Sequence, residues 1–210
     1  MNTRSEKRRD KSTTLIPGWV KVTQTAFVGA LVPVYWRQYG PGNFLWFSDV
    51  ALLTSVPALW LESPLLASTQ AIGVLVPETA WLVDFSSGVL TGRTPINLAN
   101  YMFDRRLPRF VRALSLFHLW LTPILVFIVS RVGYDRRALR YQTGATAVIL
   151  LASWRFTKPG DNVNWVYSRK EIRSPRARVG FVMLLIVAIP LAFHVPAHLL
   201  FNRLFRAPAR

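Results

Sequence analysis

Long apolar runs separated by shorter polar stretches dominate this chain. Six apolar segments lie at about 20–36, 43–61, 65–83, 110–130, 141–154 and 178–200. A helix needs about 20 residues to cross the hydrocarbon core of a bilayer, and about 17 can suffice. The second, third, fourth and sixth segments meet this length; the first is borderline, and the fifth crosses only if it extends to about Phe156. The pattern predicts an all-α, polytopic membrane protein with about six transmembrane helices in one bundle.

Prolines and tryptophans mark the interiors and the ends of these segments. Prolines inside the segments predict kinked helices around a cavity, because neighbouring helices can satisfy the carbonyl groups that proline frees. These prolines are Pro33, Pro57, Pro77, Pro123 and Pro190. Tryptophans near segment ends are typical of the membrane interface, here Trp36, Trp46, Trp60, Trp81 and Trp154. We expect a disordered basic tail over 1–19, a transmembrane domain over 20–203 and a C-terminal tail over 204–210.

The chain is strongly basic, with a net charge of +16 over 210 residues. Such a charge can indicate nucleic-acid binding. Here, however, the lysines and arginines lie mainly between the apolar runs, as in membrane proteins whose basic loops sit at lipid headgroups. We therefore expect a membrane lipid and no nucleic acid as partner. The absence of cysteine excludes disulfides, thiolate metal sites and cysteine nucleophiles. Lysine and arginine divide evenly between the two faces, so the orientation stays open.

Four polar residues within the apolar segments fall at one depth. At about 1.5 Å per residue, Ser48 and Asp49 lie about 8–9 Å into the second segment and His118 about 12 Å into the fourth. Glu78 lies about 8 Å before the end of the third segment. The second and fourth segments begin at the membrane face where the third ends, so these depths share one origin. The sequence therefore predicts one polar pocket near that face.

Two polar loops, 85–109 and 155–177, emerge at the same face. The first contains NYMFDRRLPRF, for which we expect a short interfacial helix capped by Asn100. The second contains a turn at KPGD followed by a basic stretch. Both loops bring a basic rim to the pocket, formed by Arg93, Arg105, Arg106, Arg109, Lys158 and Arg169. Such a rim could hold the carboxylate or phosphate of a small acidic or acyl substrate.

The buried polar residues allow a functional and a structural interpretation. A charge at the bilayer centre costs at least about 2.5–3.5 kcal/mol on insertion scales, so such groups face inward and pair. Hydrogen bonds that lock helices together would explain Asp49 and Glu78 about as well as a working site. His118 favours function, because imidazole transfers protons near neutral pH. His194 and His198 have metal-ligand spacing but no carboxylate nearby; we interpret them as structural and expect no metal or cofactor.

Several stretches of the chain resemble known membrane proteins. At YGPGNFLWFSDVALL, SLFHLWLTP, GYDRRAL and NVNWVY it resembles uncharacterised bacterial integral-membrane proteins, over nearly its whole length. More distantly, it resembles the superfamily of androgen-induced transmembrane threonine hydrolases and YwaF-like membrane proteins, which share the order of these motifs. The resemblance implies a hydrolase of fatty acid esters that uses a threonine and a histidine in adjacent helices. His118 matches the histidine, and Ser48 or Asp49 falls nearest the threonine.

The leading hypothesis is a lipid-ester hydrolase or acyltransferase in a bacterial cytoplasmic membrane. Its catalytic residues would be Ser48, Asp49 and His118, with Asp49 orienting His118 and with Ser48 or a water attacking the substrate. Binding residues would be Asn43, Glu78, Arg105, Arg106, Asn162 and Asn164. The asparagines among them could donate to an oxyanion or equally serve as loop caps. The alternative is a non-catalytic membrane protein that binds a lipid or positions partners; a small transporter is a third possibility.

Overall fold

The computed structural model describes residues 14–167 and 174–205, and all regular secondary structure in these ranges is helical. Each of the six apolar segments is largely helical, which confirms the predicted all-α class. The main helices are α1 (Gly18–Tyr39), α2 (Phe47–Trp60), α3 (Pro64–Thr91), α4 (Arg109–Leu114), α5 (His118–Val132), α6 (Ala138–Phe156), α7 (Pro175–Ile189) and α8 (Val195–Leu204). Short 3-10 helices η1 (Pro41–Leu45), η2 (Asn100–Phe103), η3 (Ser115–Phe117) and η4 (Val163–Trp165) lie between them, and a π-helical turn, η5 (Pro190–His194), joins α7 to α8.

Three helical stretches of the described chain are long and apolar enough to cross a membrane. They are Pro64–Thr91, Arg109–Val132 and Pro175–Leu204. α2 is apolar but shorter. By length and composition, the helices thus support a multi-pass membrane protein, with three of the six predicted spans meeting the requirement. The outward side chains of α7, such as Met183, Leu184 and Val187, are exposed and apolar, as a lipid-facing helix requires.

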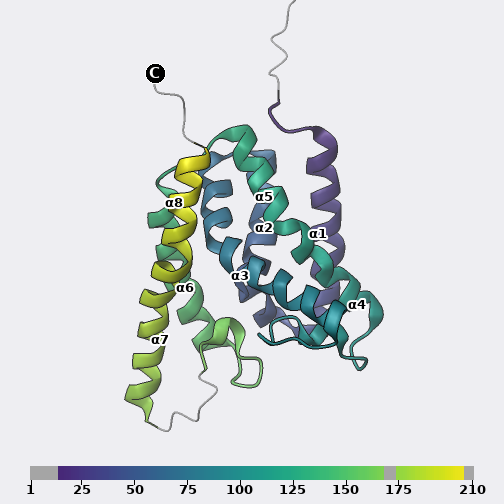
Figure 1. Ribbon diagram of the computed structural model, residues 1–210, viewed down its shortest axis with the longest axis vertical. Helices are drawn as coiled ribbons and strands as arrows, with labels where there is room; N and C mark the ends of the chain where they lie inside the picture. The colour runs from purple at the N-terminus through teal and green to yellow at the C-terminus, as the bar shows by residue number, and fades with distance from the viewer. Residues whose placement is uncertain (1–13, 168–173, 206–210) are drawn as a thin grey trace, which may run out of the picture.

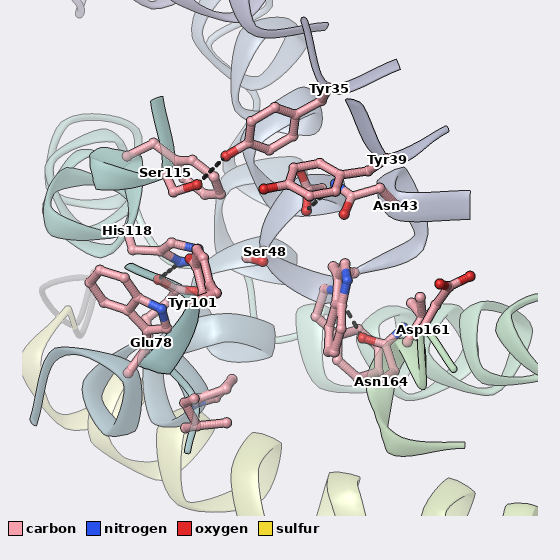
Figure 2. A pocket seen from close by; sticks show the side chains of 18 of the residues that line it. Tyr35, Tyr39, Asn43, Ser48, Glu78, Tyr101, Ser115, His118, Asp161 and Asn164 are labelled. Atoms are coloured by element: carbon pink, nitrogen blue, oxygen red, sulfur yellow. Dashed lines mark hydrogen bonds and ion pairs between the residues drawn. The ribbon is translucent and has the colours of Figure 1, made fainter. Parts of the chain in front are cut away.

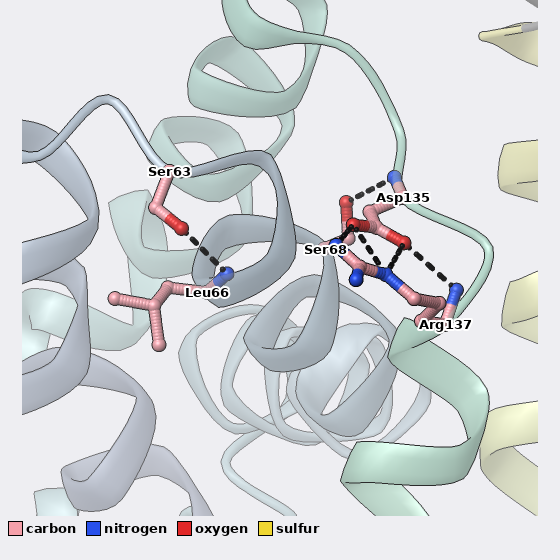
Figure 3. A network of polar contacts seen from close by, with 5 residues as sticks. All are labelled: Ser63, Leu66, Ser68, Asp135 and Arg137. Carbon is pink, nitrogen blue, oxygen red and sulfur yellow. Dashed lines mark hydrogen bonds and ion pairs between the residues drawn. The ribbon is translucent and has the colours of Figure 1, made fainter.

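The helix α3 lies at the centre of the bundle, packed against α2, α5 and α6 (Figure 1). It begins where the Ser63 hydroxyl accepts a hydrogen bond from the Leu66 amide (3.3 Å), with Pro64 in the first turn (Figure 3). It ends at Gly92, whose φ of 72° is left-handed. Gly73 allows close packing on α6, because a Cβ there would collide with the Gln142 side chain.

The connection between α5 and α6 is tied to α3. The Asp135 amide donates to the Ser68 hydroxyl (2.9 Å), and the Asp135 carboxylate pairs with Arg137 (2.8 Å), as Figure 3 shows. The hydrogen bond from Arg137 lowers the pKa of Asp135. This connection therefore fixes the end of the bundle that lies away from the cavity described below.

The chain after α3 is organised by one buried carboxylate, Asp84. Asp84 has no exposed surface, and its two oxygens accept the amides of Ile96 (2.8 Å), Leu98 (2.7 Å) and Ala99 (2.8 Å). The predicted helix at this site is present as η2, but the expected cap is wrong. Asn100 is its first residue and makes no capping bond, because Asp84 already holds the preceding amides.

The two ends of the described chain lie at the same end of the bundle (Figure 1). Glu62 anchors the first residues by accepting the amides of Leu15 (3.0 Å) and Ile16 (3.1 Å) and the Lys21 ammonium (2.8 Å). Ile16 is fully buried. The predicted disordered tails, 1–19 and 204–210, fall mostly outside the described residues. In the part of the first tail that is described, the chain is already anchored at Leu15.

The second polar loop turns as predicted at its start. The amide of Asp161 donates to the carbonyl of Lys158 (3.0 Å), which closes the turn at KPGD. The following basic stretch lies largely outside the described residues, and so does Arg169 of the predicted rim.

Candidate functional site

A cavity of about 560 Å³ opens at the end of the bundle opposite to the two described chain ends. Its wall is formed by the end of α1, the start of α2, the middle of α3, the start of α5, and the segments around η2 and η4. The volume is in the range of pockets that hold small organic ligands. Six residues predicted for the site line this cavity: Asn43, Ser48, Asp49, Glu78, His118 and Asn164.

His118 and Glu78 form a buried pair in the cavity wall. The distance between Nδ1 of His118 and Oε2 of Glu78 is 2.7 Å (Figure 2). The imidazole is sandwiched between neighbouring rings, with centroid distances of 4.5 Å to Trp81 and 4.1 Å to Phe117. A carboxylate at Nδ1 fixes the ring orientation and favours a proton on Nδ1. Nε2 is then left as the acceptor nitrogen, and it has no hydrogen-bond partner among the described residues.

The predicted partner of His118 is therefore wrong. Asp49 was expected to orient the imidazole, whereas the carboxylate in contact is that of Glu78. The physical reason is packing, because α3 and α5 lie directly against each other and bring Glu78 onto the histidine. Depth along a helix can be read from the sequence, but the direction in which each side chain points cannot.

Asp49 occupies the first turn of α2 without a full set of partners. It is 4 % exposed, and its Oδ1 has no hydrogen-bond partner among the described residues. Its Oδ2 has one long contact, 3.5 Å from Nδ2 of Asn43. The positive end of the α2 dipole favours a carboxylate at this position. The adjacent Ser48 also lines the cavity, and its hydroxyl has no partner in the described part of the chain.

Asn164 holds the start of α2 in place from the loop after α6. Its Oδ1 accepts the Phe47 amide (3.1 Å), and its Nδ2 donates to the Leu45 carbonyl (2.6 Å) and to the Ser153 hydroxyl (3.1 Å). Both protons of the side-chain amide are thus used. Of the two roles left open for this residue, the structure assigns the structural one, because Asn164 has no free donor for an oxyanion.

This loop has an unusual backbone. Asn162, Asn164 and Trp165 have φ values of 39°, 51° and 59°. Asparagine tolerates the left-handed region, but it is costly for tryptophan. The hydrogen bonds of Asn164 and an edge-to-face contact between Trp165 and Trp46 (5.9 Å) maintain the conformation. Strain held by surrounding contacts is typical of functional sites.

The remaining predicted site residues do not line the cavity. Asn162 accepts the Tyr167 amide (2.8 Å) and so caps its own loop. Arg106 pairs with Asp104 (3.0 Å), and Arg105 is exposed. In the described part of the chain the lining contains no lysine or arginine, so the predicted basic rim does not extend into it. The charged lining residues are instead Asp49, Glu78 and Asp161.

Sequence reasoning missed the aromatic walls of the cavity. They comprise Tyr35, Tyr39, Trp46, Phe47, Trp81, Tyr101, Phe117 and Trp165. The hydroxyls of Tyr35 and Ser115 lie 2.6 Å apart (Figure 2). Burial raises the pKa of Tyr101, which keeps its hydroxyl neutral. Trp46 and Trp81 were assigned to the membrane interface. Trp46 lies two residues before Ser48 and Trp81 lies three residues after Glu78, and this proximity in the sequence was the available signal.

The histidines at the opposite end make hydrogen bonds of a structural kind. His198 lies between the Tyr134 hydroxyl (2.7 Å) and the Asn202 amide (2.7 Å). His194 is buried, with its Nε2 3.5 Å from the Thr146 hydroxyl. No cluster of three or more histidines and carboxylates that could hold a metal is present within residues 14–167 and 174–205.

Comparison with protein families, with characterised proteins and with solved structures found no match to this chain. The functional argument below therefore depends on the geometry of the cavity.

Proposed function

We propose that the cavity is the active site of a membrane-embedded hydrolase or acyltransferase that acts on lipid esters. The observation that carries the proposal is the buried pair of Glu78 and His118, 2.7 Å apart, in the wall of a cavity lined by Ser48. A base oriented by a carboxylate, in a cavity that also presents a hydroxyl, supplies the groups that a mechanism with an oxygen nucleophile requires.

In this reaction His118 acts as the general base. Glu78 accepts the proton of Nδ1, and Nε2 takes a proton from the attacking oxygen, which is that of Ser48 or of a water. The attacking oxygen forms a bond to the acyl carbon, the ester C–O bond breaks, and Nε2 returns its proton to the leaving alcohol. When Ser48 attacks, a water or a second alcohol then releases the acyl group by the same steps.

The first turn of α2 supplies donors for the developing oxyanion. Amides in the first turn of a helix lack partners within the helix. That of Phe47 is taken by Asn164, whereas those of Ser48 and Asp49 have no partner outside α2 among residues 14–167 and 174–205. Backbone donors at a helix start stabilise developing negative charge, and losing one such donor costs about 10²–10³ in rate in known hydrolases.

The proposal includes the setting of the enzyme. The three membrane-length helices support a membrane location, and the cavity lies at one end of the bundle, where a lipid ester bond would be within reach. We propose a bacterial cytoplasmic membrane as its location, because its motifs resemble those of bacterial integral-membrane proteins and, more distantly, those of the transmembrane hydrolases.

One observation favours a second function, a lipid-binding protein without catalysis. The Ser48 hydroxyl and Nε2 of His118 are not hydrogen-bonded to each other, although nucleophile and base normally are. In this alternative the pair of Glu78 and His118 would shape the ligand site and stabilise the packing of α3 on α5.

Activity on esterified lipids in maltoside micelles distinguishes these functions. His118→Ala should lower the rate by about 10²–10⁴, and Glu78→Gln should lower it less. Ser48→Ala should abolish labelling by a fluorophosphonate if Ser48 attacks, and should retain activity if water does. His198→Gln, at the far end of the bundle, is the matched histidine control. Monodisperse His118→Ala protein with wild-type activity, or a wild-type protein inactive on every ester, would refute the hydrolase.

A further inference from the structure

The cavity has a charge opposite to that of the chain. The charged groups of its lining, apart from His118, are the carboxylates of Asp49, Glu78 and Asp161, in a protein with a net charge of +16. Glu78 is paired with His118, whereas Asp161 is exposed at the turn after α6. Asp49 and Asp161 therefore remain to interact with a ligand.

Asp49 lacks the partner that a buried carboxyl group needs. Its Oδ1 is buried and without a hydrogen bond in the described residues, and its Oδ2 has only the 3.5 Å contact to Asn43. A carboxylate in a site of low dielectric is costly without a paired charge. A cation or a hydrogen-bond donor on a ligand would supply what the protein does not.

Aromatic rings enclose the space beside these carboxylates. Tyr39 lies next to Asn43 (Figure 2), within range of the charge of Asp49. Trp46 meets Trp165 edge to face. Tyr35, Trp81 and Tyr101 continue the wall toward His118. Several aromatic faces together with carboxylates form the type of site that recognises organic ammonium groups, since the ring faces are negative and the site excludes water.

We propose that this cavity binds an organic ammonium group, with Asp49 as its counter-ion and with aromatic rings around its methyl or methylene groups. Ammonium binding does not require catalysis. Only the further assignment, that the ester substrate is one that carries an ammonium group, rests on the proposed function. The lining argues against an anionic substrate headgroup, because phosphate or carboxylate would face three carboxylates and no described lysine or arginine.

Calorimetric titration of the full chain in maltoside micelles tests the charge requirement. The probes are choline and its uncharged isostere 3,3-dimethylbutan-1-ol, which has carbon in place of nitrogen. Choline should bind at least about tenfold more tightly, because a desolvated cation–π contact and a charge pair are both lost in the isostere. Equal binding of the two probes, or no binding of choline, would overturn the proposal.

Variants locate the site. Asp49→Asn keeps the shape and should weaken choline binding about tenfold while leaving the isostere unaffected. Asp161→Asn, at an exposed position that tolerates substitution, should weaken it about two- to threefold and still tests the charge if Asp49→Asn does not fold. Asp104→Asn, outside the cavity, is the matched control. Choline affinity unchanged by both cavity variants, or lowered equally by the control, would overturn the proposal.

The lipid environment identifies the source of the ammonium group. In nanodiscs of phosphatidylglycerol, choline should bind as in micelles. Loss of choline binding in phosphatidylcholine nanodiscs supports a lipid headgroup as the ligand, and retained binding there supports a soluble amine. The two proposals can also fail separately. Choline binding without hydrolysis of any ester leaves only the ammonium site, whereas hydrolysis of lipid esters by a protein that does not distinguish choline from its isostere leaves only the hydrolase.

Discussion

Replacing Asp84 with alanine tests whether one buried carboxylate holds the segment that closes the cavity. Its oxygens accept three backbone amides at 2.7–2.8 Å, and Leu98, which donates one of them, lines the cavity together with nearby Tyr101. A buried donor left unpaired costs about 1–3 kcal/mol. Water entering beside the cavity would satisfy part of this loss, so we expect Asp84→Ala to lower the free energy of unfolding by about 3–5 kcal/mol rather than by the full sum.

Thermal unfolding in maltoside micelles, followed by tryptophan fluorescence, measures the effect. At about 2–4 °C per kcal/mol for a chain of this size, the midpoint should fall by about 6–20 °C. Trypsin should also cleave faster after Arg93, Arg105 and Arg106, which flank the released segment. Asp84→Asn keeps one acceptor oxygen and should lie between wild type and alanine.

Asp104→Ala is the matched control, because Asp104 accepts one backbone amide, that of Arg106 (2.9 Å), and its pairing with Arg106 is at the surface. Its midpoint should stay close to that of the wild type. The reasoning is refuted if Asp84→Ala and Asp104→Ala unfold at the same temperature and are cleaved by trypsin at the same rate.

Four further predictions follow from the fold and the site. Asn164→Ala removes two hydrogen bonds at the start of α2 and one to Ser153 of α6, and should destabilise by about 2–4 kcal/mol, more than Asn162→Ala; equal unfolding midpoints would contradict this. Gly88→Ala should lower the unfolding midpoint because its Cβ would collide with the Phe103 ring, whereas the Cβ of Gly180→Ala would meet open space. The opposite order of midpoints would show that η2 moves to accommodate the Cβ at position 88. The hydrogen bond from Lys21 lowers the pKa of Glu62 below its usual value of 4.5. The stabilisation of the N-terminal segment by Glu62 is therefore complete above about pH 4.5 and is lost as the pH falls through the lower folded pKa. Proteolysis near Lys21 should rise only in that acidic range in the wild type, and should not depend on pH there in Glu62→Gln. The chain has no cysteine, so single cysteines can be labelled selectively. Thr14→Cys and Phe205→Cys should label from one membrane side and Pro41→Cys from the other. Labelling of Thr14→Cys and Phe205→Cys from opposite sides would show that one helix does not cross.

The helices were the most predictable part of this molecule. Apolar runs of membrane length leave the backbone little alternative to a helix, so every predicted segment is largely helical, although 43–61, 110–130 and 178–200 each cover more than one helix. The boundaries were less certain. The third segment was ended at residue 83, whereas α3 continues to Thr91. This error left Asp84 outside the apolar segment and hid its role as the anchor of the following segment.

The depth of polar residues was also predictable, because a helix has a fixed rise per residue. That argument placed Ser48, Asp49, Glu78 and His118 near one face, and all four line the cavity. The pairing of Glu78 with His118 was not predictable, since it depends on the rotation of α3 and α5 about their axes. The hydrogen bonds of Asn164 to the start of α2 join residues more than a hundred positions apart. They depend on a left-handed backbone conformation that no local sequence pattern indicated.

The position of both described chain ends at one end of the bundle, opposite to the cavity, has a consequence for how the protein can be coupled to others. A folded domain, an affinity tag or a surface linker attached beyond Leu15 or Phe205 would extend from the end away from the cavity mouth. The protein can therefore be immobilised by either terminus with its mouth facing the bulk solution. Gene fusion beyond either described end would add a partner at the end of the bundle away from the cavity.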